Sequence, residues 1–368
     1  MDSRVRGNDE ETSEIASAIS MNAAHDLKLD YPHAAPPAPG TVTHVAPGVL
    51  WLRMPLPFAL DHINLWLLED GDGWTLVDCG YGSEATRELW ERHFATTLSQ
   101  RPIRRIIATH YHPDHLGNAQ WLAERFGCCV AMTHAEFLTA HAMSGQNSGY
   151  ALAGTVALFR RHGMIDEHLG PLAARGNHYL RGVPTLPMSF DRLLDTDDVR
   201  IGERTWQVIE GHGHSPEHAS LADIGNALLI SGDMLLPRIS TNVSVSPIEP
   251  NGDPLRRFLD SLARFENLPV DTLVLPSHGL PFRGIALRVA ELRAHHAARL
   301  EELEAALEAR GSATATDIVP VLFRRELDLQ QRFFAMGEAI AHLNYLWHAR
   351  RVQRREDATG LIRYALLH

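Results

Sequence analysis

The chain has 368 residues, of which 45% are hydrophobic and 21% charged, as is typical of a globular protein of one or two domains. This composition excludes a disordered, collagen-like or coiled-coil chain, and no apolar run approaches the roughly 18–20 residues that a membrane span requires. The net charge of −11 argues against a general nucleic-acid binder, because phosphate binding requires a basic face.

The N-terminal segment is polar. Residues 1–30 contain no apolar stretch of the kind found in secretory signals, so they predict a disordered tail in which Met21 is an alternative start to Met1. Residues 32–39 are rich in proline and alanine, which completes a tail and linker over residues 1–40. The chain has three cysteines, two of them adjacent, which argues against a disulfide framework and predicts a cytoplasmic protein.

Strand-like and helix-like segments alternate from residue 41 onwards. The patterns predict strands at 41–53, 62–69 and 74–78, a helix at 83–97 capped by Ser83, a strand at 103–109, a helix at 115–126 and a strand at 129–133. Alternation of this kind is typical of an α/β layered fold.

Residues 134–182 are helical in pattern and interrupt the alternation, so we expect an insertion that covers a site. Beyond it the sequence predicts strands at 200–210, 219–223 and 227–231, a long loop at 237–254, a helix at 255–268, a strand at 272–275 and a long helix at 284–309. Gly311 ends that helix and the main domain, which spans residues 41–309. Residues 311–368 predict two helices and a β wing at 352–356 and 361–364.

The densest group of metal-ligand side chains lies in residues 109–117, which read Thr-His-Tyr-His-Pro-Asp-His-Leu-Gly. His110 and His112 are two apart at a strand end, so they project to the same side and can share one ion. Asp114 and His115 stand at the start of a helix and can turn toward a neighbouring ion. Zn²⁺ binds imidazole nitrogen and carboxylate oxygen at roughly 2.0–2.2 Å. A polar loop with solvated histidines is the alternative, and the position after a buried strand favours the metal site.

Three further strand ends carry a histidine or an aspartate in a glycine-containing loop. They read Gly-His-Gly-His-Ser-Pro-Glu-His at 211–218, Ser-Gly-Asp at 231–233 and Leu-Pro-Ser-His-Gly at 275–279. Loops at strand ends are where α/β sheets gather their ligand sites.

With these motifs in this order, residues 41–305 resemble the metallo-β-lactamase-fold hydrolases, a family that includes glyoxalase II, N-acyl homoserine lactonases and RNase Z-type nucleases. The resemblance implies a four-layered αββα metallo-β-lactamase fold and two divalent metal ions per chain, Zn²⁺ in the first instance, with Mn²⁺ or Fe²⁺ as alternatives. It implies His110, His112 and His214 as ligands of the first metal, Asp114, His115 and His278 as ligands of the second, and Asp233 as the bridge.

Three positions bear on this assignment. The family pattern Gly-His-Ser/Thr-x-x-His begins at Gly213, so His214 takes the ligand role, and His212 is either a rim residue beside the site or a plain surface residue. Asp78 stands in an element that resembles the family's Asp-Thr-Gly, where the carboxylate supports a metal-bound histidine; a turn-capping aspartate is the alternative. Asp233 stands where β-lactamases of this fold often carry cysteine, which places the chain away from β-lactam hydrolysis.

The C-terminal residues 311–368 resemble the small winged-helix domain that follows the hydrolase in some β-lactamase-like proteins. Eight arginines against six acidic residues give too weak a basic excess for a nucleic-acid face, so packing or homodimerisation is the expected role. Glu338 and His342 lie four apart on a predicted helix; they are either a metal-binding pair or, as we expect for an isolated pair, structural.

The resemblance implies a hydrolase in which a metal-bridging hydroxide attacks the carbonyl of an ester, thioester or lactone, with Asp114 as the catalytic residue that orients the nucleophile and shuttles its proton. We expect a small-molecule acyl substrate, no membrane and no nucleic-acid partner. The alternative is a metal-dependent ribonuclease or phosphodiesterase, which the missing Lys/Arg cluster disfavours.

Residues around the expected pocket have two interpretations. Tyr150, Phe159, His178 and Tyr179 either line the pocket or pack in the core, and core packing is favoured for each. Arg238 either meets a substrate carboxylate or phosphate or forms a surface ion pair, and residues 242–247 are candidates for the pocket floor.

Overall fold

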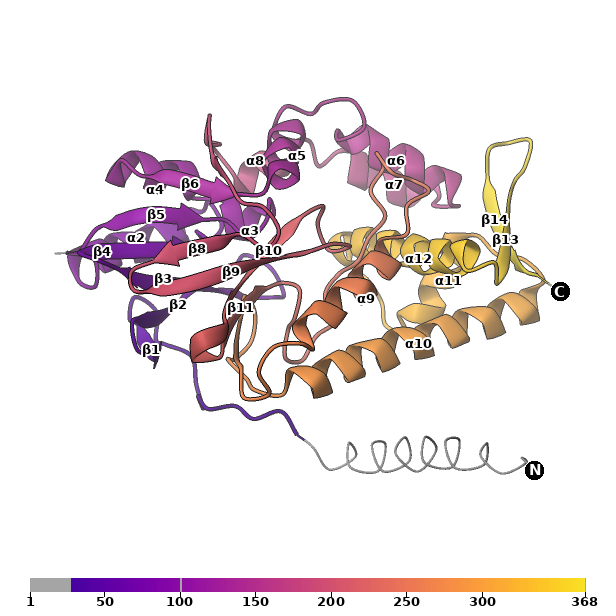
Figure 1. Cartoon of the computed structure of the whole chain (residues 1–368). Coiled ribbons are helices and arrows are strands. Elements are labelled where there is room, and N and C mark those ends of the chain that lie inside the picture. Colours follow the sequence, from indigo (N-terminus) through magenta and orange to yellow (C-terminus); the bar gives the residue numbers. More distant parts are fainter. Residues whose placement is uncertain (1–27, 100, 368) are drawn as a thin grey trace, which may run out of the picture.

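Two β-sheets packed face to face form the centre of the protein, shown in Figure 1. The computed structural model describes residues 28–99 and 101–367. The first sheet has the strand order β1-β2-β3-β4-β5-β6-β7, and the second has the order β12-β11-β10-β9-β8. The strands of the first are β1 (Thr43–Ala46), β2 (Val49–Pro55), β3 (His62–Asp70), β4 (Gly73–Val77), β5 (Ile103–Ile107), β6 (Cys129–Met132) and β7 (Asp191–Arg192). Those of the second are β8 (Asp198–Ile201), β9 (Arg204–Gly211), β10 (His218–Asp223), β11 (Leu228–Gly232) and β12 (Leu273–Pro276).

Strand β3 shows how the alternating sequence builds the layers. Leu65 and Leu67 point into the core between the first sheet and its covering helices, whereas Trp66 and Leu68 point into the core between the two sheets. Successive side chains of a strand face opposite sides, so a strand that is apolar at every position must be covered on both faces. Trp206 of β9 meets this central core from the second sheet.

Helices cover the outer face of each sheet. Helix α2 (Glu84–Ala95) begins at the predicted cap Ser83, whose hydroxyl accepts the Thr86 N–H. Trp90 of α2 and Leu122 of α4 (Ala119–Phe126) enter the core outside the first sheet. Helices α9 (Pro254–Phe265) and α10 (Ile285–Arg310) cover the second sheet. These layers are the αββα arrangement expected from the sequence.

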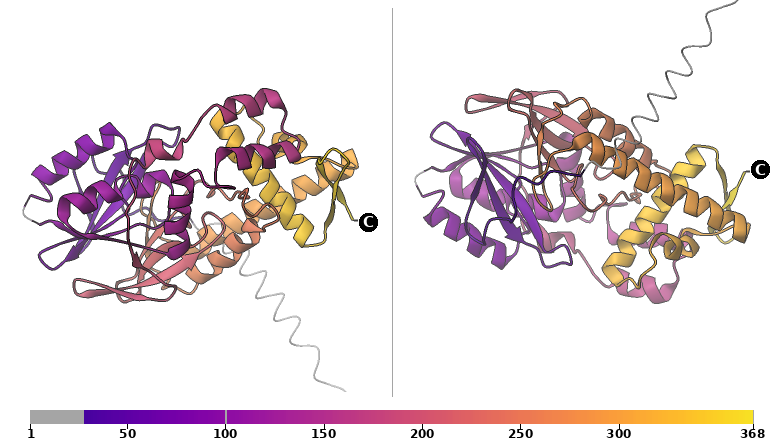
Figure 2. Two further views of the ribbon diagram at one scale, coloured as in Figure 1. Left: turned by 90° about the horizontal axis from the view of Figure 1, so that it is seen from above. Right: turned by 90° about the horizontal axis from the view of Figure 1, so that it is seen from below.

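The insertion predicted at 134–182 is helical. It comprises α5 (His134–Ser144), α6 (Leu152–Arg161), α7 (Asp166–Ala173) and α8 (Tyr179–Gly182). Helices α6 and α7 lie against α12 (Leu329–His348) of the C-terminal region, as both views of Figure 2 show. The rings of Phe159 on α6 and Phe333 on α12 meet edge to face, with their centroids 5.7 Å apart.

The C-terminal region has the predicted two helices and wing. Helix α11 (Ala315–Leu322) and α12 precede strands β13 (Val352–Glu356) and β14 (Ile362–Leu366), which pair antiparallel. Val352 and Tyr364 belong to the same hydrophobic core as α9 and α10, so this region is continuous with the core outside the second sheet.

Three predicted elements are each divided in two. Predicted strand 41–53 is β1 and β2, which turn at Gly48 (φ 65°), and predicted strand 200–210 is β8 and β9, which turn at Gly202 (φ 56°). Predicted helix 115–126 is α3 (Pro113–Leu116) and α4. The break falls at Asn118, whose side-chain amide donates to the carbonyls of Cys79, Gly80 and Tyr81. The two-residue strand β7 is too short to have a sequence pattern and was missed.

The predicted N-terminal tail falls mostly on residues 1–27, which lie outside the described residues. Within residues 28–40, which the structure describes, at least three residues contact the main domain. Asp30 pairs with Arg283, and Leu29 and Tyr31 contact the core outside the second sheet. Within the described part of the chain, no helix combines the length and the apolar character that crossing a bilayer requires.

Candidate metal centre

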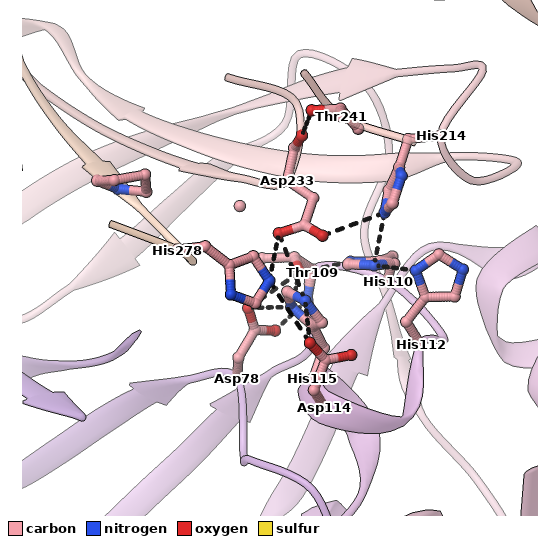
Figure 3. Close-up of polar contacts among 12 residues, drawn as sticks. Asp78, Thr109, His110, His112, Asp114, His115, His214, Asp233, Thr241 and His278 are labelled. Atoms are coloured by element: carbon pink, nitrogen blue, oxygen red, sulfur yellow. Dashed lines mark hydrogen bonds and ion pairs between the residues drawn. The ribbon is translucent and has the colours of Figure 1, made fainter. Parts of the chain in front are cut away.

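The strand ends that carry the predicted ligands meet at one edge of the sandwich (Figure 3). Strands β4, β5 and β6 are parallel to one another, and so are β11 and β12, so their carboxyl ends project in common directions. Residues 110–112 follow β5, and residues 114 and 115 lie on α3. His214 lies between β9 and β10, Asp233 follows β11, and His278 follows β12.

The first cluster consists of His110, His112, His214 and Asp233, each with one ligand atom within 4.8 Å of those of the other three. His110 Nε2 lies 2.8 Å from His112 Nδ1 and 3.2 Å from His214 Nε2. His110 and His112 lie in a bend after the end of β5 rather than on the extended strand end that the sequence predicts, and this bend brings both rings to one point.

The second cluster consists of Asp114, His115 and His278, again with ligand atoms within 4.8 Å of one another. Asp114 Oδ2 lies 3.5 Å from His278 Nε2 and 3.7 Å from His115 Nε2. Asp114 and His115 reach this point because Pro113 starts α3 immediately after His112, which turns the chain.

Asp233 lies between the two clusters and presents one oxygen to each (Figure 3). Its Oδ2 is 3.3 Å from His214 Nε2 of the first cluster, and its Oδ1 is 3.4 Å from His278 Nε2 of the second. A carboxylate placed in this way can bind two ions at once. The structure therefore brings together all seven residues that the sequence predicts and gives Asp233 the position of a bridge.

The cluster atoms fit a pair of cations in their chemistry as well as their position. His115 Nε2 and Asp233 Oδ1 are buried and have no hydrogen-bond partner among the described residues, which is costly for polar atoms unless something else satisfies them. Five imidazoles and two carboxylates are donors that Zn²⁺, Mn²⁺ and Fe²⁺ all accept.

Outer hydrogen bonds orient the histidine rings. His214 Nδ1 donates to the Asn242 carbonyl at 2.8 Å, and His278 Nδ1 donates to the His62 carbonyl at 2.8 Å. A carbonyl can only accept, so each Nδ1 carries the proton and each Nε2 presents its lone pair to the cluster.

Asp78 supports His115 from behind, as the sequence resemblance implies. Its Oδ2 lies 2.8 Å from His115 Nδ1, and the same carboxylate accepts the N–H and the hydroxyl of Thr109 at 2.8 and 3.0 Å. Asp78 has a φ of 60°, a left-handed conformation that aspartate tolerates better than most residues. Its carboxylate therefore positions His115 rather than capping a local turn.

The two clusters differ in the charge of their histidines. Burial and the neighbouring imidazoles lower the pKa of His110 and His112 well below the usual value, so these rings stay neutral. Burial opposes protonation of His115 as well, but Asp78, Asp114 and Asp233 raise its pKa well above the usual value. Burial also disfavours ionised Asp233, yet His278 and His115 hold its pKa well below the usual range.

Sequence reasoning missed the role of His218. This buried ring lies behind Asp233, and its Nε2 accepts the Asp233 N–H at 3.1 Å. The ring occupies the space beside Gly232, where a Cβ would come within 2.2 Å of His218 Nε2. The family pattern included His218, but its contact with Asp233 is visible only in three dimensions.

The loop predicted as a pocket floor at 242–247 lies behind His214. Asn242 supplies the carbonyl described above, and Ser244 donates to the Asn242 side chain at 2.8 Å. The Val245 N–H donates to the carbonyl of Gly337 on α12. The C-terminal region therefore contacts the loop that orients the predicted metal ligand His214.

The residues given two interpretations mostly turn out to be structural. Phe159 and Tyr179 are 2% exposed and belong to hydrophobic cores, which confirms core packing for both. His212 is half-buried, its Nδ1 bonds to the Pro216 carbonyl at 2.7 Å, and it belongs to neither cluster. The guanidinium of Arg238 lies over the ring of Tyr31, and its Cζ is 5.7 Å from the centroid of that ring.

The remaining candidates lie outside the two clusters. Tyr150 and His178 are half-buried, and the His178 ring packs against Phe333 with centroids 6.4 Å apart. His342 is buried and its Nδ1 donates to the Glu338 carbonyl at 2.9 Å. Neither Glu338 nor His342 belongs to the groups of potential ligands found among the described residues.

Comparisons with known proteins agree with the fold. Residues 59–278 match the model of the metallo-β-lactamase superfamily, and residues 300–367 match the metallo-β-lactamase-like C-terminal domain. A β-lactamase domain protein from Burkholderia ambifaria is 49% identical with a TM-score of 0.87, and the match covers 94% of this chain and all of that one.

Two curated relatives are more distant. Probable metallo-hydrolase YqjP from Bacillus subtilis is 25% identical over 312 residues, covering 81% of this chain and 92% of that protein. A human acyl-coenzyme A thioesterase is 26% identical over 196 residues, covering 51% of this chain and 63% of the thioesterase, so under two thirds of that protein is matched.

Proposed function

The chain belongs to the metallo-β-lactamase superfamily and is a metal-dependent hydrolase with a binuclear His/Asp site, and we propose that it hydrolyses small acyl esters, thioesters or lactones. In this proposal His110, His112 and His214 hold the first ion, Asp114, His115 and His278 hold the second, and Asp233 is shared. Zn²⁺ is the proposed metal.

One observation carries the proposal: the two oxygens of Asp233 face different clusters, at 3.3 Å from His214 and 3.4 Å from His278. Two divalent ions held this close together supply a water that ionises near neutral pH and an electrophile for a carbonyl oxygen. With water as the nucleophile, no serine or cysteine nucleophile is required.

In this proposal Asp114 is the proton-transfer residue. Its side chain is 19% exposed, against 10% for Asp233, so it is the more accessible of the two carboxylates. Its Oδ2 lies within 3.7 Å of both histidines of the second cluster. From this position the carboxylate can orient a water at the cluster, accept its proton and pass it to the leaving group.

The acyl specificity is supported by one relative. The relative, an acyl-coenzyme A thioesterase, is 26% identical to this chain. The net charge of −11 opposes the binding of long polyanions, which disfavours nucleic acid as the substrate.

The test is turnover of a panel by the metal-loaded protein: a generic thioester, an aryl ester, an acyl homoserine lactone and single-stranded RNA in matched buffer. The proposal predicts hydrolysis of at least one acyl substrate and its loss after chelation of the metal. Cleavage of RNA without turnover of any acyl substrate would replace it by the nuclease alternative.

A further inference from the structure

We propose that Glu136 is a positioning residue for the first cluster, because its buried carboxylate joins the loop that carries His110 and His112 to the loop that carries His214. The inference rests on the metal centre proposed above. Glu136 lies in the first turn of α5, outside the seven predicted ligands.

The contacts of Glu136 reach both ligand loops. One oxygen, Oε2, accepts the N–H of Tyr111, the residue between His110 and His112, at 3.0 Å. The other, Oε1, accepts the hydroxyl of Ser215 and the N–H of Glu217, each at 2.7 Å. Ser215 directly follows His214. A single carboxylate therefore spans two loops that are about a hundred residues apart in the sequence.

The peptide units around Tyr111 are held from two sides. Glu136 accepts the Tyr111 N–H, and the hydroxyl of Tyr179 on α8 donates to the Tyr111 carbonyl at 2.7 Å. With both polar groups of Tyr111 bonded, the turn that aims His110 and His112 at the same point has little freedom. The insertion thus contributes to the metal centre through side chains that bond to the backbone of the ligand loop, rather than through a ligand of its own.

The carboxylate is suited to this position because all of its contacts are donors. Glu136 is fully buried, and a carboxylate has lone pairs for several N–H or O–H groups at once. Glutamine has the same shape, but its amide has one oxygen and one NH₂ group. In Glu136→Gln the NH₂ group faces either the Tyr111 N–H or the donors of the other loop, so one loop loses its contact.

Contacts besides those of Glu136 also hold α5 in place. The Thr133 hydroxyl donates to the Glu217 carbonyl at 2.7 Å, and the Ala135 N–H donates to Glu217 Oε2 at 2.9 Å. Glu217→Gln is therefore a matched control. It makes the same chemical change in a neighbouring side chain, and it leaves in place the backbone N–H that Glu217 donates to Glu136.

The experiment measures Zn²⁺ affinity for each cluster by competition with a chelating indicator. His278→Ala removes a ligand of the second cluster, so the first cluster is the tight site that remains. His112→Ala removes a ligand of the first cluster, so the second cluster is the tight site that remains. Glu136→Gln is added to each background, with Glu217→Gln in parallel. We expect Glu136→Gln to raise the Kd of the first cluster about 10- to 100-fold and to change that of the second less than about threefold. Glu217→Gln should change both less than about threefold.

Equal weakening of both clusters by Glu136→Gln, or an unchanged Kd of the first cluster, would overturn the inference. If Glu136→Gln does not fold, as judged by circular dichroism and Tm, Ser215→Ala decides. Ser215→Ala removes one of the three donors to Glu136 and should raise the Kd of the first cluster alone by about three- to tenfold. An unchanged Kd in this variant would overturn the inference. Wild-type protein that binds no Zn²⁺ would instead refute the proposed function.

Discussion

Replacing Asp78 by asparagine tests how the second cluster is oriented. Asparagine tolerates the left-handed backbone that Asp78 adopts, with its φ of 60°, so the backbone at residue 78 should keep its conformation. The carboxylate accepts from Thr109 N and Oγ1 and from His115 Nδ1, at 2.8, 3.0 and 2.8 Å. If the amide oxygen keeps the Thr109 N–H, the NH₂ group faces the His115 Nδ1 proton. The ring must then rotate or move its proton to Nε2, the atom that faces the cluster.

Loss of a carboxylate behind a metal-bound histidine typically weakens metal binding about 10- to 100-fold, or about 1.4–2.7 kcal/mol. We therefore expect Asp78→Asn to raise the Kd of the second cluster by this factor in the His112→Ala background, measured by chelator competition. Asp223→Asn is the control, because Asp223 is also buried and bonds to Arg204 at the far end of β10. The reasoning is refuted if Asp78→Asn leaves the second cluster within threefold of wild type, or if Asp223→Asn weakens it as much.

Three further predictions concern protons. Asp114→Asn should lower kcat about 10²- to 10⁴-fold in the acyl assay if Asp114 moves the proton of the nucleophile, and undiminished kcat contradicts that role. Burial opposes protonation of His115, but Asp78, Asp114 and Asp233 raise its pKa, so a metal ion must displace a proton there. For each unit by which the pH falls, the Kd of the second cluster should rise about tenfold per displaced proton, and the Kd of the first cluster should rise less. Titrations at pH 6, 7 and 8 test this. Burial lowers the pKa of His93 to about 4, so below the unfolded value of about 6.5 the unfolded chain binds more protons and stability falls as the pH falls. Urea unfolding of the metal-free protein should show His93→Phe losing about 2 kcal/mol less than wild type between pH 7.5 and pH 5, and equal losses would contradict this.

The seven cluster residues were predictable because their signals are local. His110, His112 and Asp114 share one short motif, and Asp233 and His278 each follow an apolar strand in a glycine-containing loop. Loops at strand ends are where α/β folds gather their ligand sites, and the resemblance to the family implied which residue belongs to which cluster.

The residues that orient the cluster were less predictable. His62 and Asn242 act through backbone carbonyls, to which their side chains give no clue. Glu136 resembles any acidic residue in the first turn of a helix, a position where the helix dipole favours negative charge. Its burial against Tyr111 and Ser215 arises from packing between segments far apart in the chain, and no local pattern records it.

The paired metal centre can be tested directly by anomalous diffraction from crystals grown with Zn²⁺, using data collected on both sides of the zinc absorption edge. Two peaks are predicted, one beside His110, His112 and His214 and one beside Asp114, His115 and His278, with an oxygen of Asp233 bonded to each. A single peak, or two peaks without Asp233 between them, would contradict a shared binuclear centre.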